Sequence, residues 1–249
     1  MRRSILPFLI LIVLTACSEA QEAAPDAQAE AFWPTPETNA TPKVLLIGID
    51  GIRVDVMREV PTPNIDALAA AGAFSEDARN VRPTVSGPCW SSILIGVGPE
   101  KHGVHNNDFS TNNYTEYPDF LTRIETVEPE LGTFAAIDWL PLGAEAEGGP
   151  LISDALDKKV VLDGYEFGWL EADSISVIAT ANELRTGNSD ALFVYLGAPD
   201  VISHDIGGIG QEYQDAIAAA DRHVGRLVEA VKGRPTFAQE DWLILVVTD

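Results

Sequence analysis

Hydrophobic residues along this chain form short continuous runs that alternate with helically spaced segments. The runs at residues 44–49, 131–137, 191–196 and 242–247 are typical of parallel strands covered on both faces of a sheet. Residues 63–71 and 172–184 favour helices, ended near Gly72 and Gly187. Residues 211–232 favour a longer helix with one apolar face: Tyr213, Ile217, Val224, Leu227, Val228 and Val231. The pattern predicts one α/β domain over residues 43–249, with irregular surface segments at residues 138–170.

The first 42 residues have a different composition. Arg2 and Arg3 precede an apolar run at residues 5–14, which favours a secretory signal peptide over residues 1–16. The ending Leu14-Thr15-Ala16-Cys17 resembles a bacterial lipobox, which implies acylation of Cys17 and a lipid anchor in the membrane. The alternative is an ordinary signal peptide with a chance cysteine. Residues 17–42 predict an acidic flexible linker, because they contain few large apolar residues.

The net charge and the cysteine content limit which partners and which covalent cross-links the protein can have. The formal net charge is -22, and it becomes -24 when Arg2 and Arg3 are removed with the signal peptide. Such an acidic surface argues against nucleic acid as a standing partner. The two cysteines, Cys17 and Cys89, leave no disulfide framework once Cys17 is acylated, and Cys89 is expected to be a packed helix residue. Ser18 after the acylated cysteine favours the outer membrane of a bacterial cell envelope, facing the periplasm.

Ser86 is placed where a nucleophile would lie. Strand-like residues run up to it, Gly87 and Pro88 follow, and residues 89–96 favour a helix. This order aims the Ser86 hydroxyl past a helix N-terminus, where unpaired N–H groups favour a developing negative charge. The alternative is an idle serine in a strand–turn–helix connection.

Four further polar residues follow predicted strands. Asp50 comes directly after the first strand, Asp200 and His204 lie four residues apart after the third, and Asp249 follows the last. Because ligand sites of parallel sheets lie at the carboxyl ends of the strands, we expect these side chains to converge with Ser86 in one crevice. Oxygen and nitrogen ligands suit zinc. The alternative is an Asp that caps a turn beside a loop His.

The motif Ser86-x-Pro88-x-x-x-x-Ile93-x-x-Gly96, with Pro99-Glu100-x-His102-Gly103 after it, resembles the alkaline phosphatase superfamily. The resemblance is greatest to the type I phosphodiesterases and nucleotide pyrophosphatases, and Pro199-Asp200-x-x-x-His204 matches their metal-binding segment. It implies an alkaline phosphatase-like fold, a three-layer sandwich around a mostly parallel sheet.

The resemblance also implies two divalent metal ions, expected to be zinc. One ion would be held by Asp50, Ser86 and Asp249, and the other by Asp200 and His204. In the family, a His follows the aspartate matched by Asp249 and a further His comes later. The chain is therefore expected to be incomplete at its C-terminus, to bind zinc weakly and to hydrolyse phosphate esters poorly.

The implied activity is hydrolysis of phosphate esters, of phosphodiester or pyrophosphate bonds, through a covalent intermediate on Ser86. The alternatives are a phosphomonoesterase or sulfatase-like hydrolase on the same scaffold, and a catalytically inactive ligand-binding lipoprotein. Trp90 replaces the Arg of the sulfatase motif, which argues against formylglycine maturation. His102 is expected to support the site, Asn107 to meet the small-molecule substrate, and His223 to lie on the surface. The leaving group, metal identity and oligomeric state stay open.

Overall fold

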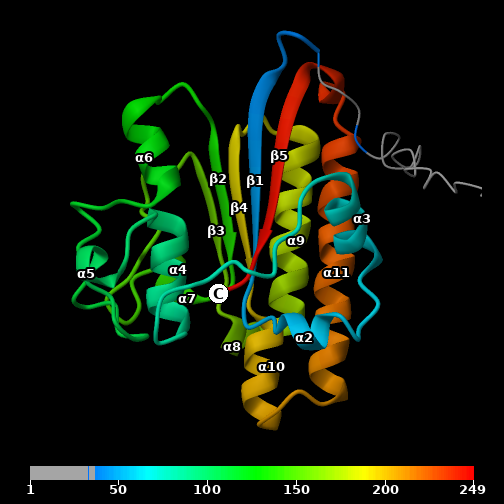
Figure 1. The fold of residues 1–249 in the computed structure, drawn as a ribbon. Helices are drawn as coiled ribbons and strands as arrows, with labels where there is room; N and C mark the ends of the chain where they lie inside the picture. The colour runs from blue at the N-terminus through cyan, green and yellow to red at the C-terminus, as the bar shows by residue number, and fades with distance from the viewer. Residues whose placement is uncertain (1–32, 34–36) are drawn as a thin grey trace, which may run out of the picture.

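A single parallel sheet organises the molecule. The structure is a computed structural model and describes residues 33 and 37–249. Five strands pair in the order β3-β2-β4-β1-β5, and every neighbouring pair is parallel. The strands are β1 (Thr41–Ile49), β2 (Thr133–Ile137), β3 (Lys158–Val161), β4 (Ala191–Leu196) and β5 (Glu240–Val247). All five carboxyl ends therefore lie at one edge of the sheet, where Figure 1 shows the chain's C-terminus.

Helices connect the strands and cover both faces of the sheet (Figure 1). They are α2 (Val54–Met57), α3 (Pro63–Ala71), α4 (Ser86–Ile95), α5 (Pro99–His102), α6 (Phe120–Val127), α7 (Leu140–Gly143), α8 (Gly164–Phe167), α9 (Trp169–Thr186), α10 (Ala198–Ile206), α11 (Gln211–Lys232) and the 3-10 turn η1 (Phe237–Gln239). Among the described strands, β2 and β3 are consecutive in sequence and paired, whereas β1 pairs with the later strands β4 and β5.

The alternating side chains of each strand enter two different cores. In β1, Leu45 and Ile47 pack with α9 and α11, whereas Leu46 packs with Trp90 of α4 on the opposite face. Helix α3 lies on the α9 and α11 side through Ile65. The molecule is thus a three-layer α/β sandwich, which confirms the predicted fold class. The continuous apolar runs of β1 and β4 arise because both faces of these strands are covered.

Several element boundaries differ from the sequence prediction. Residues 138–170, expected to be irregular, include α7, β3 and α8, and β3 pairs with β2 as an edge strand of the sheet. The residues before Ser86 form no strand, although Val85 is extended with φ -131° and ψ 137°. Helix α4 begins at Ser86 itself rather than at Cys89. Strand β1 begins at Thr41, two residues before the predicted domain boundary.

The predicted signal peptide, the predicted lipidation site Cys17 and most of the predicted linker lie outside the described residues. In the part of the chain that the structure describes, no helix combines the length and the hydrophobicity needed to cross a membrane.

Candidate active site

Three carboxylates meet at the carboxyl ends of neighbouring strands. Asp50 follows β1, Asp249 follows β5, and Asp200 lies in the first turn of α10 after β4. The Gly51 N–H donates to Asp249 Oδ1 at 3.0 Å. A Cβ added at Gly51 would lie 2.7 Å from both Cα and Cβ of Asp200. Only a glycine therefore allows the Asp50 turn and α10 to approach so closely.

Asp50 is the most buried of the three carboxylates, with 2% of its surface exposed. The hydroxyl of Tyr195 donates to its Oδ2, while its Oδ1 is buried without a hydrogen-bond partner among the described residues. Burial raises the pKa of Asp50 well above its usual value, and Asp249 and then Asp200 raise it further. These negative charges lie close enough to oppose each other's ionisation.

Asp200 and His204 lie one helical turn apart on α10. His204 Nε2 is 3.4 Å from Asp200 Oδ1, and the imidazole is largely exposed. Burial raises the pKa of Asp200, His204 opposes that shift, and Asp249 adds to it. The structure thus brings His204 beside the carboxylates through Asp200, with its ring open to solvent.

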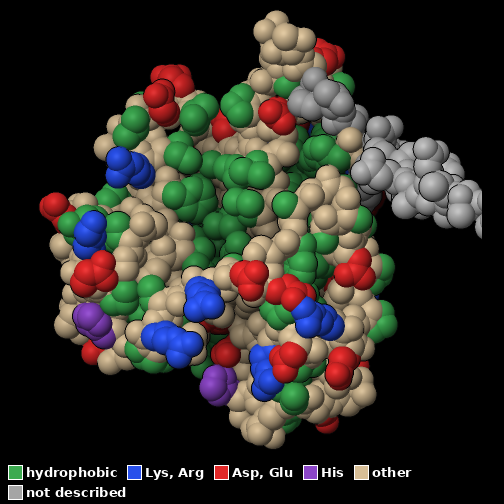
Figure 2. Space-filling model, in the orientation of Figure 1, with side chains coloured by type: hydrophobic (Ala, Val, Ile, Leu, Met, Phe, Trp, Pro, Cys, Tyr) green, Lys and Arg blue, Asp and Glu red, His purple; other side chains and the backbone are tan. Residues whose placement is uncertain are grey.

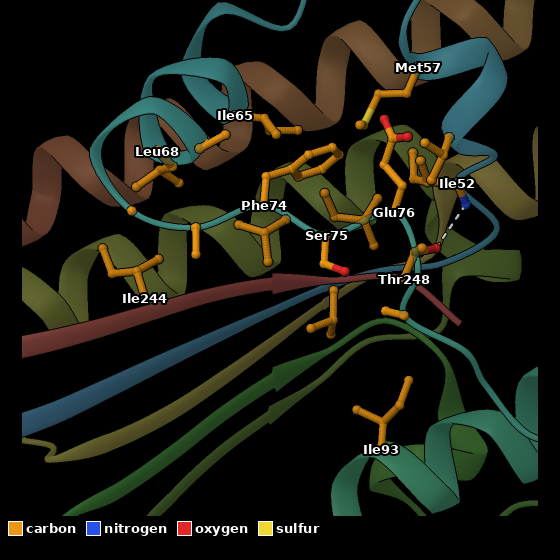
Figure 3. Close-up of a pocket in the computed structure, with 18 of the residues that line it drawn as sticks. Ile52, Met57, Ile65, Leu68, Phe74, Ser75, Glu76, Ile93, Ile244 and Thr248 are labelled. Atoms are coloured by element: carbon orange, nitrogen blue, oxygen red, sulfur yellow. Dashed lines mark hydrogen bonds between the residues drawn. The ribbon is translucent and has the colours of Figure 1, made fainter. Parts of the chain in front are cut away.

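The turn after Asp50 is held in place by long-range hydrogen bonds. The hydroxyl of Tyr213 in α11 donates to the carbonyl oxygen of Gly51 at 2.6 Å and accepts from the Arg53 N–H at 2.8 Å. The Ile52 N–H donates to Thr248 Oγ1 at 3.0 Å, which is the dashed line in Figure 3. The position of Asp50 is therefore fixed from both α11 and the end of β5.

Ser86 is the first residue of α4. Its Oγ makes no hydrogen bond with the residues that the structure describes, and the side chain is half-buried. Cys89, one turn further along, is completely buried, as expected for a packed helix residue. Burial raises the pKa of the Cys89 thiol to about 11, and the charges of Asp249 and Asp50 contribute. The first turn of α4 thus lies within electrostatic reach of these carboxylates.

Asn107 and His102 support the start of α4. Asn107 Oδ1 accepts from the Gly87 N–H at 2.8 Å. His102 Nδ1 accepts from the Val104 N–H at 3.1 Å, which leaves Nε2–H to donate to Ser92 Oγ at 3.0 Å. The Ser92 hydroxyl in turn donates to the carbonyl oxygen of Pro88 at 2.7 Å. His102 is fully buried, and burial lowers the pKa of its imidazole.

The carboxylates have the chemistry of a divalent-cation site. Asp50 Oδ1 is buried without a donor, and the neighbouring charges of Asp249 and Asp200 disfavour its ionisation. A cation would reverse that effect, since it pairs with all three carboxylates. Over residues 37–249, however, no group of three His, Cys, Asp or Glu side chains already has an arrangement that could hold a metal ion.

An apolar groove runs along β5 next to this site. It has a volume of about 680 Å³ and extends from α3 and the segment after it to Thr248 and Asp249. Figure 3 shows Phe74, Leu68 and Ile244 among its lining side chains, with Ile93 of α4 beyond the strands. Figure 2 shows hydrophobic side chains gathered in a hollow over the strands of the sheet. On β5, Leu243 is 55% exposed and Leu245 is 40% exposed.

Sequence reasoning missed one buried carboxylate behind the site and misplaced one histidine of α11. Asp138 follows β2 directly, as Asp50 follows β1, and it is completely buried. The position of an Asp directly after an apolar strand could have identified it. His223, predicted to be a surface residue, is only 6% exposed, so that prediction was wrong. Its burial follows from its position on α11 between the buried residues Ala220 and Leu227, which lie three and four positions away on the same helix face.

Comparison with known proteins shows that nearly all of the folded part of this chain matches one protein family. The sequence profile of the type I phosphodiesterase / nucleotide pyrophosphatase family matches residues 44–160 and 150–249. Human ectonucleotide pyrophosphatase/phosphodiesterase family member 7 is 26% identical over 235 residues, covering 88% of this chain and 49% of its own length. The rat protein of the same name is 27% identical over 206 residues, covering 76% and 46%. The chain spans about half the length of these curated relatives.

A solved structure shares the fold. Murine ectonucleotide pyrophosphatase/phosphodiesterase 5, an inactive variant in complex with AMP, superposes with a TM-score of 0.63 at 18% identity. The match covers 83% of this chain and 56% of that one. At this identity the similarity establishes the alkaline phosphatase-like fold.

Proposed function

Because the chain belongs to the type I phosphodiesterase / nucleotide pyrophosphatase family, we propose that the protein hydrolyses phosphodiester or pyrophosphate bonds with Ser86 as the nucleophile. The observation that carries this proposal is the position of α4. Its first residue is Ser86, and its first turn lies within electrostatic reach of Asp50 and Asp249. A hydroxyl at a helix start beside a cluster of carboxylates is an arrangement suited to phosphoryl transfer.

The reaction proceeds in two displacements at phosphorus. The Ser86 hydroxyl loses its proton to solvent as its oxygen attacks, the leaving group departs with its electron pair, and a phosphate ester remains on Ser86. Water then attacks the same phosphorus and releases the Ser86 oxygen, which regains a proton. The first-turn N–H groups of α4 favour the negative charge that develops on the phosphoryl oxygens.

Asn107 assists from the loop beside α4. Its Oδ1 is held by the Gly87 N–H, and its Nδ2 makes no hydrogen bond with the described part of the chain. Because Asn107 is exposed, Nδ2 can donate to a nonbridging phosphoryl oxygen next to Ser86. The same hydrogen bond from Gly87 orients the amide for this role.

Two divalent cations, with zinc as the expected metal, complete the site. Asp50, Asp249 and Ser86 would hold one cation, and Asp200 with His204 would hold the other. When bound, the cations supply positive charge that favours the Ser86 alkoxide and offsets the charge of the phosphate ester. The unpaired Oδ1 of Asp50 supports this assignment, because a buried carboxylate oxygen needs a positive partner.

A phosphate ester with a flat leaving group fits the opening of the site. Tyr165 of α8 is 75% exposed, and its ring packs edge-on against Trp169 with centroids 5.0 Å apart. Burial raises the pKa of Tyr165, and the Asp200 charge adds to the shift, which places the ring within electrostatic reach of Asp200. A nucleobase or aryl group could stack on this face. The AMP bound by the murine relative is consistent with a nucleotide substrate.

We also propose that the mature protein is lipid-anchored through Cys17 in a bacterial cell envelope, facing the periplasm. The lipobox-like residues 14–17 support this proposal. The acidic segment at residues 18–42 would then separate the catalytic domain from the membrane.

The proposed nucleophile is tested by Ser86→Ala in the protein expressed from its complete gene. Initial rates of bis(p-nitrophenyl) phosphate hydrolysis should fall by several powers of ten, because removing a nucleophile typically costs that much. Cys89→Ala is the matched control, since Cys89 lies on the same turn and its thiol is protonated at neutral pH. Near-normal turnover by Ser86→Ala, or a loss confined to Cys89→Ala, would move the nucleophile elsewhere.

A further inference from the structure

Two acidic side chains that are not part of the proposed site are buried behind it. Asp138, directly after β2, has no exposed surface. Neither Oδ1 nor Oδ2 accepts a hydrogen bond from the residues that the structure describes. An ionised carboxylate without a donor would be very costly at such a position. The buried group must therefore be paired with a cation or carry a proton.

The buried neighbour of Asp138 is Asp173 of α9, which is 1% exposed: the Gly197 N–H donates to Asp173 Oδ1, and a Cβ added at Gly197 would lie 3.1 Å from Asp138 Oδ1. Asp173 Oδ1 accepts from the Gly197 N–H at 3.0 Å and from the Ala198 N–H at 3.3 Å. These are the first N–H groups of α10, which have no partner inside their own helix. Asp173 therefore caps α10 from a neighbouring helix, as an ionised acceptor.

The charges around the pair decide which residue holds the proton. Burial raises the pKa of Asp138 well above its usual value, the charge of Asp173 raises it further, and the charge of Asp50 makes a smaller contribution in the same direction. Burial raises the pKa of Asp173 to about 6, while the neighbouring Asp138 side chain and the N–H groups of Ala198 and Gly197 lower it. Tyr195, also nearby, keeps its own proton because its pKa is raised by burial.

We propose that Asp138 is a positioning residue: its protonated carboxyl group donates to the Asp173 carboxylate, and the hydrogen-bonded pair fixes the first turn of α10 and hence Asp200. The role of Asp200 in the site rests on the proposed function, whereas the shared proton and the cap do not.

Packing shows why a fixed first turn matters. A Cβ added at Gly197 would lie 2.3 Å from the Trp169 ring and 3.1 Å from Asp138 Oδ1. On its other side, Asp200 already contacts the backbone at Gly51, where a Cβ would lie 2.7 Å away. The first turn of α10 is thus held between the buried acidic pair and the Asp50 turn, and a shift there would displace Asp200.

The protonation of Asp138 in the native state is tested by the pH dependence of unfolding. The native state binds the Asp138 proton more tightly than the unfolded chain, in which a carboxyl group titrates near about pH 4. The wild-type unfolding constant should therefore rise with pH, by up to about tenfold per unit, from that value up to the raised pKa of Asp138. Asp138→Asn keeps a donor to Asp173 without a titrating proton, so it should lack this contribution.

The measurement is urea unfolding of the wild type and Asp138→Asn at pH 5, 6, 7 and 8, with a chelator in every sample. The proposal requires the ratio of the wild-type to the variant unfolding constant to increase with pH. A ratio that stays constant across these pH values would show that Asp138 carries no extra proton in the native state and would overturn the proposal.

The positioning role is tested by amide hydrogen exchange and by activity. Exchange at Gly197 and Ala198 should accelerate at least tenfold in Asp138→Ala and stay close to wild type in Asp138→Asn. Hydrolysis of bis(p-nitrophenyl) phosphate should fall more than tenfold in Asp138→Ala, with rescue to within about threefold by Asp138→Asn. Equal exchange in the two variants contradicts the positioning role. If the wild type hydrolyses no phosphate ester, the proposed function fails, while exchange and unfolding still decide the acidic pair.

Discussion

Gly51→Ala should disturb the proposed site through one well-defined contact. Gly51 has φ +69°, a conformation that L side chains rarely adopt. The new methyl group would lie 2.7 Å from Cα and Cβ of Asp200. Because one of those atoms is backbone, a side-chain rotation of Asp200 cannot relieve the clash. The first turn of α10 or the Asp50 turn must move.

The expected loss in the free energy of unfolding of Gly51→Ala has two contributions. The left-handed conformation costs about 1 kcal/mol for a residue with a Cβ, and inserting a methyl group into a packed contact costs about 1–3 kcal/mol. Gly51→Ala should therefore lower the free energy of unfolding by about 2–4 kcal/mol, a large share of the roughly 5–15 kcal/mol typical of a domain.

Gly207→Ala at the end of α10 is the matched control. Gly207 has φ +65°, but its added Cβ would meet no atom within 4 Å. Gly207→Ala should therefore lower the free energy of unfolding only by the cost of the left-handed conformation, about 1 kcal/mol.

Urea unfolding of both variants, followed by phosphodiester hydrolysis under conditions where both are folded, separates the two effects. Gly51→Ala should lose more stability than Gly207→Ala, and it alone should lose activity, because it alone displaces Asp200. Equal stability losses in the two variants, with equal activities, would refute the close approach of the Asp50 turn and α10.

Three further predictions concern the anchor, the buried histidine and the cation site. Cys17→Ala should release the protein from the membrane fraction or block its processing; unchanged size and membrane association on fractionation would contradict the anchor. Burial lowers the pKa of His223 to about 4, so its contribution to stability is lost as the pH falls from about 6.5 toward 4. His223→Leu should therefore reduce the acid-induced loss of stability by up to about 3 kcal/mol in urea unfolding, and an unchanged pH profile would show that the imidazole is solvated. Zinc should raise the melting temperature of the wild type but much less that of Asp50→Asn, in a thermal scan with and without the metal; equal shifts would place the cation elsewhere.

Strands β1 and β4 were predictable because burial on both faces leaves a continuous apolar run in the sequence, and β5 has such a run although Leu243 and Leu245 are exposed. The apolar runs at residues 44–49, 191–196 and 242–247 correspond to β1, β4 and β5. Since parallel strands end at one edge, the polar residues after them could be placed together without knowing the strand order. The structure accordingly brings Asp50, Asp200 and Asp249 within electrostatic reach of one another.

Features that depend on tertiary packing were not predictable in this way. Strand β3, Lys158–Val161, is short and begins with two lysines, so its apolar signal is weak, and only its pairing with β2 makes it a strand. His223 lies on a buried face of α11. The sequence prediction defined the buried face of this helix from its large apolar residues, so it did not include His223. The capping of α10 by Asp173 joins residues 24 and 25 positions apart, a distance that no local motif spans.

The most direct test of the central claim, that Ser86 attacks phosphorus, is the stereochemical outcome of hydrolysis. A phosphorothioate diester that is chiral at phosphorus would be hydrolysed in oxygen-18 water by the protein expressed from its complete gene, and the configuration of the product determined. Two successive displacements, first by Ser86 and then by water, predict net retention of configuration. Net inversion would mean that water attacks the substrate directly, and it would contradict the assignment of Ser86 as the nucleophile.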